Sequence, residues 1–205
     1  VDPPSMEELA KHGIPGFKGY QPGDYDYSTK MGGLPALREE TRRIHEKKGR
    51  LLLYTCPPAC WQGTRIGRAH GKEWALMTAP GVYSYRWLPQ GEGWYLCLYV
   101  PAWRDHFSKV MAERILETGA DGYRLDVAAA LYPCYNPAHA HYDGTVRSTV
   151  APREMAEFQR VCKQAVHAKS PDAVVTTEYG GSDFLTQFSD GYMIASMAFY
   201  HPPEK

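Results

Sequence analysis

The chain has 205 residues, and its 23 Lys and Arg residues balance 23 Asp and Glu residues, so that the formal net charge is zero. A neutral chain lacks the excess of basic charge that draws proteins to nucleic acid or to an anionic membrane surface, and we expect neither partner. Hydrophobic residues make up 43% of the chain and charged residues 22%, which is typical of a globular domain and excludes an intrinsically disordered chain.

The sequence contains no predicted transmembrane segment, because no run of about 18 apolar residues occurs and Asp126 interrupts the longest candidate. The first four residues, Val-Asp-Pro-Pro, lack an initiator Met, and no basic and then apolar segment follows them. No signal peptide is therefore expected in this chain. A cytoplasmic and a secreted location both stay open.

The first predicted structural unit is a helix followed by a buried strand. Gly and Pro residues interrupt residues 14–33, which we expect to form a loop after a short helix over residues 5–11. Apolar residues then recur every three or four positions over residues 34–48, which predicts an amphipathic helix. Gly49 ends this helix, and residues 51–55, Leu-Leu-Leu-Tyr-Thr, predict a fully buried strand.

The same unit recurs further along the chain. Two long aromatic-rich stretches, residues 56–94 and 128–151, separate the units, and loops of this length inside a domain are usually functional. The recurring units are helix 103–118 with strand 122–127, helix 152–169 with strand 173–178, and a shorter helix 184–188 with strand 191–195.

Strands that alternate with helices predict a parallel sheet, either an open doubly wound sheet or a β/α barrel. The nucleotide-binding form of the open sheet requires a third Gly after Gly91-Glu92-Gly93, and the sequence lacks it. The clear strands end instead in polar or acidic residues, at Thr55, Asp126 and Glu178, as active-site residues do in a barrel. We therefore predict an α/β fold of the (β/α)8 TIM-barrel type. Such barrels typically need about 250 residues, so we expect residues 1–205 to form a single barrel domain that is incomplete at one or both ends.

Asp126 and Glu178 are the candidate catalytic residues. They close successive apolar strands, so both carboxylates are expected at the carboxyl end of one sheet. Two carboxylates in one cavity can have different pKa values, one ionised as a nucleophile and one protonated as an acid, and glycoside cleavage requires that pairing. Arg124 points to the same side of its strand as Asp126 and could keep it ionised while holding a substrate hydroxyl. The alternative is that Asp126 caps the following segment and forms a structural ion pair with Arg124.

The segment 119–126 resembles the fourth-strand motif of α-amylase-type glycoside hydrolases, in which Gly-aromatic-Arg-x-Asp carries the nucleophile. The resemblance implies that Asp126 is the nucleophile and that Glu178, which ends the next strand, is the acid/base. A family of poorly characterised glycoside-hydrolase-like barrels is more similar still over residues 30–195. Its pattern is similar to the segments 33–34, 38–45, 49–54, 122–126, 134–139, 177–183 and 190–191.

The chain departs from the amylase pattern in two places. After Asp126 it continues as Val-Ala-Ala-Ala into a long loop, where amylases usually continue into a helix with a substrate-binding Lys-His pair. The third carboxylate of amylases has no clear counterpart, and Asp183 and Asp190 are the candidates.

Aromatic and polar side chains are the candidates for substrate binding. The chain has 15 Tyr and 5 Trp, whose flat apolar faces and polar tips suit stacking on sugar rings. A Tyr-rich core is the alternative, and core or lid packing is the alternative for the four tryptophans between residues 56 and 94. The candidate substrate-binding residues are Arg124, Tyr54, His70, Trp74, His139, His141 and Asp183.

The cysteines do not predict a metal site. Their number is odd, and no second pair follows Cys56 and Cys60 at zinc-finger spacing. Cys97 and Cys162 lie in apolar runs and are interpreted as small core residues.

His139 and His141 would suit zinc if they stood on a strand, with Cys134 and Asp143 nearby. The prolines at 133 and 137 indicate a loop instead. We therefore predict no metal and no other cofactor, and we interpret both histidines as hydrogen-bonding partners of substrate hydroxyls or as exposed loop residues.

The leading hypothesis is a retaining glycoside hydrolase that cleaves the O-glycosidic bonds of a carbohydrate, with Asp126 as nucleophile and Glu178 as general acid/base. The alternative is a non-catalytic carbohydrate-binding barrel that uses the same acids to bind hydroxyls. An aldolase or isomerase is less favoured, because no strand ends in Lys and no phosphate loop occurs. Esterase chemistry is disfavoured because the Gly-x-Ser-x-Gly motif is missing. A carbohydrate is the expected partner, and a homo-oligomer stays open.

Overall fold

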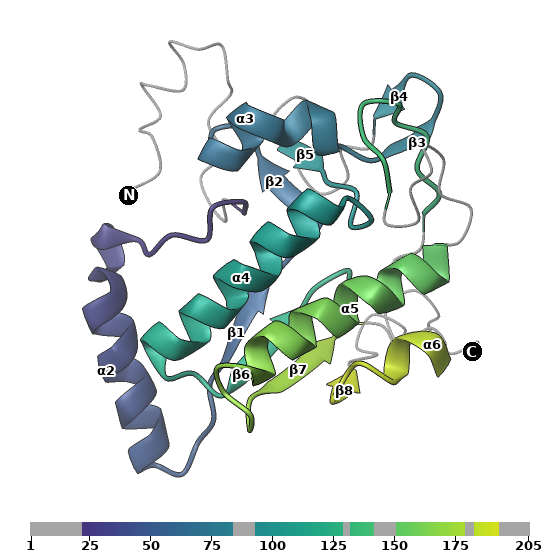
Figure 1. Ribbon diagram of the computed structural model, residues 1–205. Helices are drawn as coiled ribbons and strands as arrows, with labels where there is room; N and C mark the ends of the chain where they lie inside the picture. The colour runs from purple at the N-terminus through teal and green to yellow at the C-terminus, as the bar shows by residue number, and fades with distance from the viewer. Residues whose placement is uncertain (1–21, 84–92, 129–131, 142–150, 179–182, 193–205) are drawn as a thin grey trace, which may run out of the picture.

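The computed structural model describes residues 22–83, 93–128, 132–141, 151–178 and 183–192. Its centre is a four-stranded parallel sheet in the order β1-β6-β7-β8 (Figure 1). This order follows the chain and never reverses, as in a β/α barrel and unlike a doubly wound sheet. The strands are β1 (Leu52–Thr55), β6 (Gly122–Leu125), β7 (Val174–Thr177) and β8 (Gly191–Tyr192).

The helices that accompany these strands confirm the predicted units. They are α2 (Gly33–Glu46), α4 (Pro101–Thr118), α5 (Ala151–His167) and α6 (Asp183–Thr186). In Figure 1, α4 and α5 pack side by side and cover one face of the sheet. Pro101 stands in the first turn of α4, where a missing N–H removes no helical hydrogen bond. Gly119 ends α4 with a φ of 68°, a left-handed conformation that Gly adopts readily.

The hydrophobic core lies between these helices and the sheet. Tyr123 of β6 is 2% exposed, and its hydroxyl donates to the carbonyl oxygen of Met111 in α4 at 2.9 Å. Phe107 of α4 and Phe158 of α5 stack with ring centroids 5.7 Å apart. Burial of a side chain such as Phe contributes about 1.5–3 kcal/mol, so these contacts hold the helical layer on the strands.

The other face of the sheet is open. Leu52 and Tyr54 of β1 are 39% and 48% exposed, and Val174 of β7 is 37% exposed. Strand register places Leu52 beside Gly122 and Gly122 beside Val174, so these residues share one face. In a closed barrel this face is the interior. The described residues therefore form part of a barrel wall, as predicted.

Residues 56–94 were expected to form a loop, and this expectation is wrong, because the described part of the stretch contains short strands and a helix. The strand β2 pairs antiparallel with β5, and β3 pairs antiparallel with β4. None of these four strands belongs to the main sheet, so the described part of residues 56–94 adds no strand to the barrel wall. The elements are β2 (Ala59–Trp61), α3 (Arg65–Trp74), β3 (Met77–Ala79), β4 (Val82–Tyr83) and β5 (Gly93–Tyr95).

Helix α3 contains two glycines because it packs very closely on the neighbouring strands. The Thr64 hydroxyl caps the helix by accepting a hydrogen bond from the Gly67 N–H at 2.9 Å. A Cβ atom on Gly67 would lie 2.1 Å from the carbonyl oxygen of Trp61, and one on Gly71 would lie 2.1 Å from Cδ1 of Trp94. The glycines thus allow backbone and ring contacts that any side chain would block.

We expect Gly67→Ala to destabilise the protein, although Gly to Ala in a helix usually stabilises it by up to about 1 kcal/mol. Overpacking of this kind costs about 1–3 kcal/mol, and each kcal/mol lowers the melting temperature by about 2–4 °C in a domain of this size. Thermal unfolding followed by circular dichroism measures the effect. Gly191→Ala is the control, since its Cβ would meet Thr176 at an ordinary 3.6 Å. An unchanged or higher melting temperature for Gly67→Ala would contradict the close packing.

Three parts of the prediction lie outside the described residues: the helix over residues 5–11, residues 14–21 of the predicted loop, and residues 193–195 of the predicted strand. Among the helices that are described, none combines the length and the apolar character needed to cross a membrane.

Candidate active site

Strand register brings the candidate residues to one side of the sheet. Tyr54, Arg124 and Thr176 are paired across β1, β6 and β7, so their side chains share a face. Asp126 and Glu178 stand two positions after Arg124 and Thr176 and therefore follow on the same side. The backbone ladder continues that far, because Asp126 N–H donates to the carbonyl oxygen of Thr55 at 2.7 Å and Glu178 N–H donates to that of Leu125 at 3.1 Å.

The two carboxylates meet at Arg124. Its Nη2 atom lies 3.4 Å from Oε1 of Glu178 and 3.7 Å from Oδ1 of Asp126. Tyr54 donates a hydrogen bond from its hydroxyl to Oδ2 of Asp126, and the Arg124 guanidinium lies over the Tyr54 ring, 5.3 Å from its centroid. The structure thus brings four of the predicted site residues together.

These charged groups are shielded from solvent. The side chains of Asp126, Glu178 and Arg124 are 17%, 15% and 24% exposed. Burial raises the pKa of the Glu178 carboxyl above its usual value, and a hydrogen bond with Asp126 and the charge of Asp126 raise that pKa further. The protonated form of Glu178 is therefore favoured up to a higher pH than in an ordinary Glu.

The turn after Asp126 has an unusual backbone. Val127 has a φ of 55°, a left-handed conformation that is a genuine outlier for a β-branched residue. In this conformation the Val127 N–H donates to Oε2 of Glu178 at 3.3 Å. Strained backbone of this kind costs on the order of 1–3 kcal/mol and clusters at functional sites. The backbone here positions a donor on the second carboxylate.

His70 and Trp74 lie on α3 and interact with each other. Their rings stack with centroids 4.2 Å apart and an interplanar angle of 7°, and Nδ1 of His70 lies 3.3 Å from Oε2 of Glu73. Trp74 is only 7% exposed and also contacts the ring of Trp103. The structure gives the pair a packing role, and their predicted contact with substrate stays a prediction.

Two further acids were candidates for a third carboxylate. Asp183 is the first residue of α6 and is exposed. Asp190 accepts a hydrogen bond from the Val175 N–H at 2.8 Å and forms an ion pair with Lys163, so it holds β7 in place. Asp183 is accessible to a substrate, and its role in substrate binding stays a prediction.

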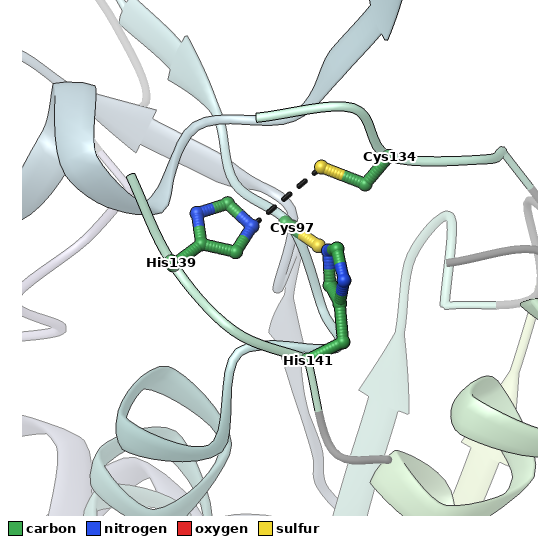
Figure 2. A group of neighbouring side chains, drawn as sticks. All are labelled: Cys97, Cys134, His139 and His141. Carbon is green, nitrogen blue, oxygen red and sulfur yellow. Dashed lines mark hydrogen bonds between the residues drawn. The ribbon is translucent and has the colours of Figure 1, made fainter. Parts of the chain in front are cut away.

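His139 and His141 are buried, with 8% and 1% of their surface exposed, so the interpretation as exposed loop residues is wrong. Figure 2 shows them facing Cys97 and Cys134. One ligand atom from each of the four residues lies within 4.8 Å of the others, so this group could hold a metal ion. Asp143, the other residue considered with them, lies outside the described residues.

The predicted tryptophans have separate environments. Trp61 is fully buried, and Trp87 lies outside the described residues. Trp94 lines a cavity of about 570 Å³ beside α3, together with Tyr83, and the two rings meet edge to face at 5.7 Å. Trp94 is therefore placed where a ring could stack on a ligand.

Neither a family model nor a curated protein sequence matches the chain. Solved structures of glycoside hydrolases do match its fold. A noncanonic maltogenic alpha-amylase from Thermotoga neapolitana is 14% identical, with 87% of this chain and 36% of that chain covered and a TM-score of 0.60. A debranching enzyme from Nostoc punctiforme is 15% identical, with 94% and 43% covered and a TM-score of 0.62.

An alpha-galactosidase from Thermus thermophilus, in complex with stachyose, is 15% identical, with 77% of this chain and 31% of that chain covered and a TM-score of 0.52. The chain thus spans less than half the length of these three structures. At such identities the similarity concerns the fold alone. The fold of this chain is similar to part of the β/α barrel of α-amylase-type glycoside hydrolases.

Proposed function

We propose that this protein is a glycoside hydrolase in which Asp126 is the nucleophile and Glu178 is the general acid/base. The observation that carries the proposal is the pair of carboxylates on neighbouring strands, which share Arg124 while the pKa of Glu178 is raised. Two acids whose environments push their pKa values apart can divide the roles of base and acid. The named substrates and activities of the structural neighbours, amylases and a galactosidase, support a carbohydrate as substrate.

The environment of each acid suits its role. Asp126 accepts a hydrogen bond from the Tyr54 hydroxyl and faces the Arg124 guanidinium, and both contacts hold its carboxyl group in a fixed position, as a nucleophile needs. Burial keeps Glu178 protonated to higher pH, as a general acid requires.

In the proposed first step, Asp126 attacks the anomeric carbon while Glu178 donates its proton to the departing glycosidic oxygen. This forms a glycosyl ester on Asp126 and releases the alcohol. In the second step, the Glu178 carboxylate takes a proton from water, which attacks the same carbon and releases Asp126. Glu178 is then protonated again, so the cycle is complete.

Retention of configuration fits the separation of the two acids. Oε1 of Glu178 and Oδ1 of Asp126 lie 3.4 and 3.7 Å from the same Nη2 atom of Arg124, so the two carboxyl groups are close neighbours with little space for water between them. Inverting enzymes need that space, with carboxyl groups about 6.5–9.5 Å apart, whereas retaining enzymes place them about 5–5.5 Å apart. A substrate that enters between the two carboxyl groups must move them apart. The separation in a retaining enzyme requires a smaller movement than the separation in an inverting enzyme.

Hydrolysis of a panel of nitrophenyl α- and β-glycosides tests the proposal. We expect release of nitrophenol from at least one sugar, and proton NMR of the first product should show the configuration of the substrate. Isothermal titration with oligosaccharides, run in parallel, separates the alternative: saturable binding without cleavage of any glycoside would overturn the enzyme and favour the carbohydrate-binding barrel. An inverted first product would overturn the retaining mechanism alone.

The raised pKa of Glu178 predicts a stability effect with a definite sign. A carboxyl whose pKa is higher in the folded state destabilises the fold once it is ionised, so stability falls as the pH rises from the ordinary value of 4.5 through the folded pKa. Glu178→Gln mimics the protonated form. We expect it to raise the melting temperature at pH 7 by a few degrees, at about 2–4 °C per kcal/mol, and to have little effect near pH 4.

Glu157→Gln is the control for this measurement. A hydrogen bond from Arg160 lowers the pKa of Glu157, so this variant should be less stable than the parent at neutral pH and the difference should shrink in acid. Scanning calorimetry from pH 4 to pH 8 compares the two. If Glu178→Gln also lost stability at pH 7, Glu178 would be an ionised partner of Arg124 and not a proton donor.

A further inference from the structure

Four buried side chains from distant parts of the chain converge beside α4. Cys97 follows β5 and precedes α4, while Cys134, His139 and His141 belong to the segment 132–141 that comes after β6. Cys97 and Cys134 are 0% exposed, and the two histidines are 8% and 1% exposed. Figure 2 shows all four side chains directed toward one point.

The spacing of their ligand atoms suits a small tetrahedral ion. With Zn–S bonds of about 2.3 Å and Zn–N bonds of about 2.0–2.1 Å, the ligand atoms of a tetrahedral zinc site lie about 3.3–3.8 Å apart. Sγ of Cys134 and Nε2 of His139 already lie 3.6 Å apart, and no pair of the four atoms is further apart than 4.8 Å. The two imidazole rings are perpendicular, with centroids 5.0 Å apart, so they approach the shared point from different directions.

We propose that Cys97, Cys134, His139 and His141 bind a Zn²⁺ ion. Two thiolates and two imidazoles form a donor set typical of zinc. Two thiolates also balance the charge of the ion, so the complete site is neutral and can be buried without an uncompensated charge. Four protein ligands fill the tetrahedron, which makes the site structural and separate from the proposed glycosidase chemistry.

The second nitrogen of His139 supports this assignment. Nδ1 of His139 lies 2.6 Å from the carbonyl oxygen of Glu73. A proton on Nδ1 donated to that carbonyl leaves the Nε2 lone pair free to face Cys134, which is the arrangement that backbone carbonyls impose on metal-binding histidines.

The adjoining segment is held to the same place. Nδ2 of Asn136 donates to the carbonyl oxygens of Lys72, Glu73 and Ala75, at 3.3, 3.1 and 2.8 Å, and Asn136 is fully buried. These contacts close the carboxyl end of α3. Asp126 follows β6 directly, and the segment 132–141 comes after it. The zinc ion would therefore hold this segment against α3 and the start of α4.

Metal analysis of the purified protein tests the proposal. We expect about one Zn²⁺ per chain by mass spectrometry of the metal content. Protein stripped of zinc and reloaded with Co²⁺ should show the strong visible absorption of tetrahedral cobalt together with a thiolate-to-cobalt charge-transfer band. Protein that carries neither zinc nor cobalt, or that contains a Cys97–Cys134 disulfide by peptide mapping, would overturn the proposal.

Variants decide where the metal sits. Cys134→Ser should lower the zinc content at least about tenfold, in line with the loss of a ligand thiolate, and Cys162→Ser should leave it unchanged because that buried thiol lies in α5, outside the cluster. His139→Cys keeps four ligands, so it should keep the ion and strengthen the charge-transfer band. This variant stays informative if Cys134→Ser does not fold. Zinc content unaffected by Cys134→Ser, or a charge-transfer band unaffected by His139→Cys, would place the ion elsewhere and overturn the proposal.

Discussion

Replacement of Asp126 by Asn is expected to remove nearly all glycosidase activity, whatever the leaving group of the substrate. Asn is close in size to Asp and can still accept a hydrogen bond from Tyr54, but its amide cannot form the glycosyl ester. Removal of a covalent nucleophile costs on the order of 10⁴-fold or more in kcat. Steady-state hydrolysis of the best nitrophenyl glycoside and of a natural oligosaccharide measures the loss.

Asp105→Asn is the matched control for this variant. Asp105 is an acid on α4 whose side chain is 64% exposed, so its amide should leave kcat unchanged. A normal melting curve for Asp126→Asn shows that the loss is chemical. Activity within tenfold of the parent protein would exclude Asp126 as the nucleophile and favour its structural pairing with Arg124.

Replacement of Glu178 by Ala is expected to have an effect that depends on the leaving group. General acid catalysis contributes about 10²–10⁴-fold, so hydrolysis of a natural glycoside, whose alcohol leaves poorly, should fall by that factor. The first step with a dinitrophenyl glycoside should be spared, because the phenolate leaves without a proton. The second step then becomes slow, and the glycosyl-enzyme should accumulate after a burst of phenolate.

Azide provides the second readout for Glu178→Ala. A small anion can enter the space left by the carboxylate and attack the glycosyl-enzyme, so azide should restore turnover of the activated substrate and produce a glycosyl azide of retained configuration. Azide should not accelerate Asp126→Asn in this way. If Glu178→Ala hydrolysed poor leaving groups as the parent does, Glu178 would not be the acid, and Asp183 would be the next residue to replace.

Periodicity in the sequence was sufficient to predict the barrel-type units. The helices predicted over residues 34–48 and 103–118 correspond to α2 (Gly33–Glu46) and α4 (Pro101–Thr118). Long amphipathic helices that end at Gly, each followed by a short apolar strand, carry strong local signals. Strand alternation also predicted correctly that Arg124 and Asp126 share one side of β6, where they meet Glu178.

The short elements that lie between β1 and α4 in the chain, from β2 to β5, could not be predicted in the same way. Its strands are two or three residues long, which is too short for alternation to be recognised. Helix α3 contains Gly67 and Gly71, residues that disfavour a helix locally. Both glycines are needed for tertiary packing, because they allow α3 to contact Trp61 and Trp94. A local sequence pattern does not reveal such a contact.

The cluster of Cys97, Cys134, His139 and His141 could not be predicted from the sequence for a related reason. Zinc-site patterns are recognised from pairs of ligands at short spacing, whereas Cys97 stands alone in an apolar run far from Cys134. Only the fold brings it to His139 and His141. The local signal that does exist is His139 and His141, two positions apart and close to Cys134, and the prolines at 133 and 137 mask it because they indicate a loop.

The left-handed turn at Val127 makes the ionisation of Glu178 visible to spectroscopy. The Val127 N–H donates to a carboxylate oxygen of Glu178, and an amide proton resonates further downfield when its acceptor is ionised than when it is protonated. The chemical shift of this one amide, followed by heteronuclear NMR across a pH series, should therefore trace the titration of Glu178 with a midpoint above 4.5. In Glu178→Gln the Val127 amide shift can respond only to Asp126. The difference between the titration curves of the parent protein and of this variant therefore reports the protonation of Glu178 separately from that of Asp126.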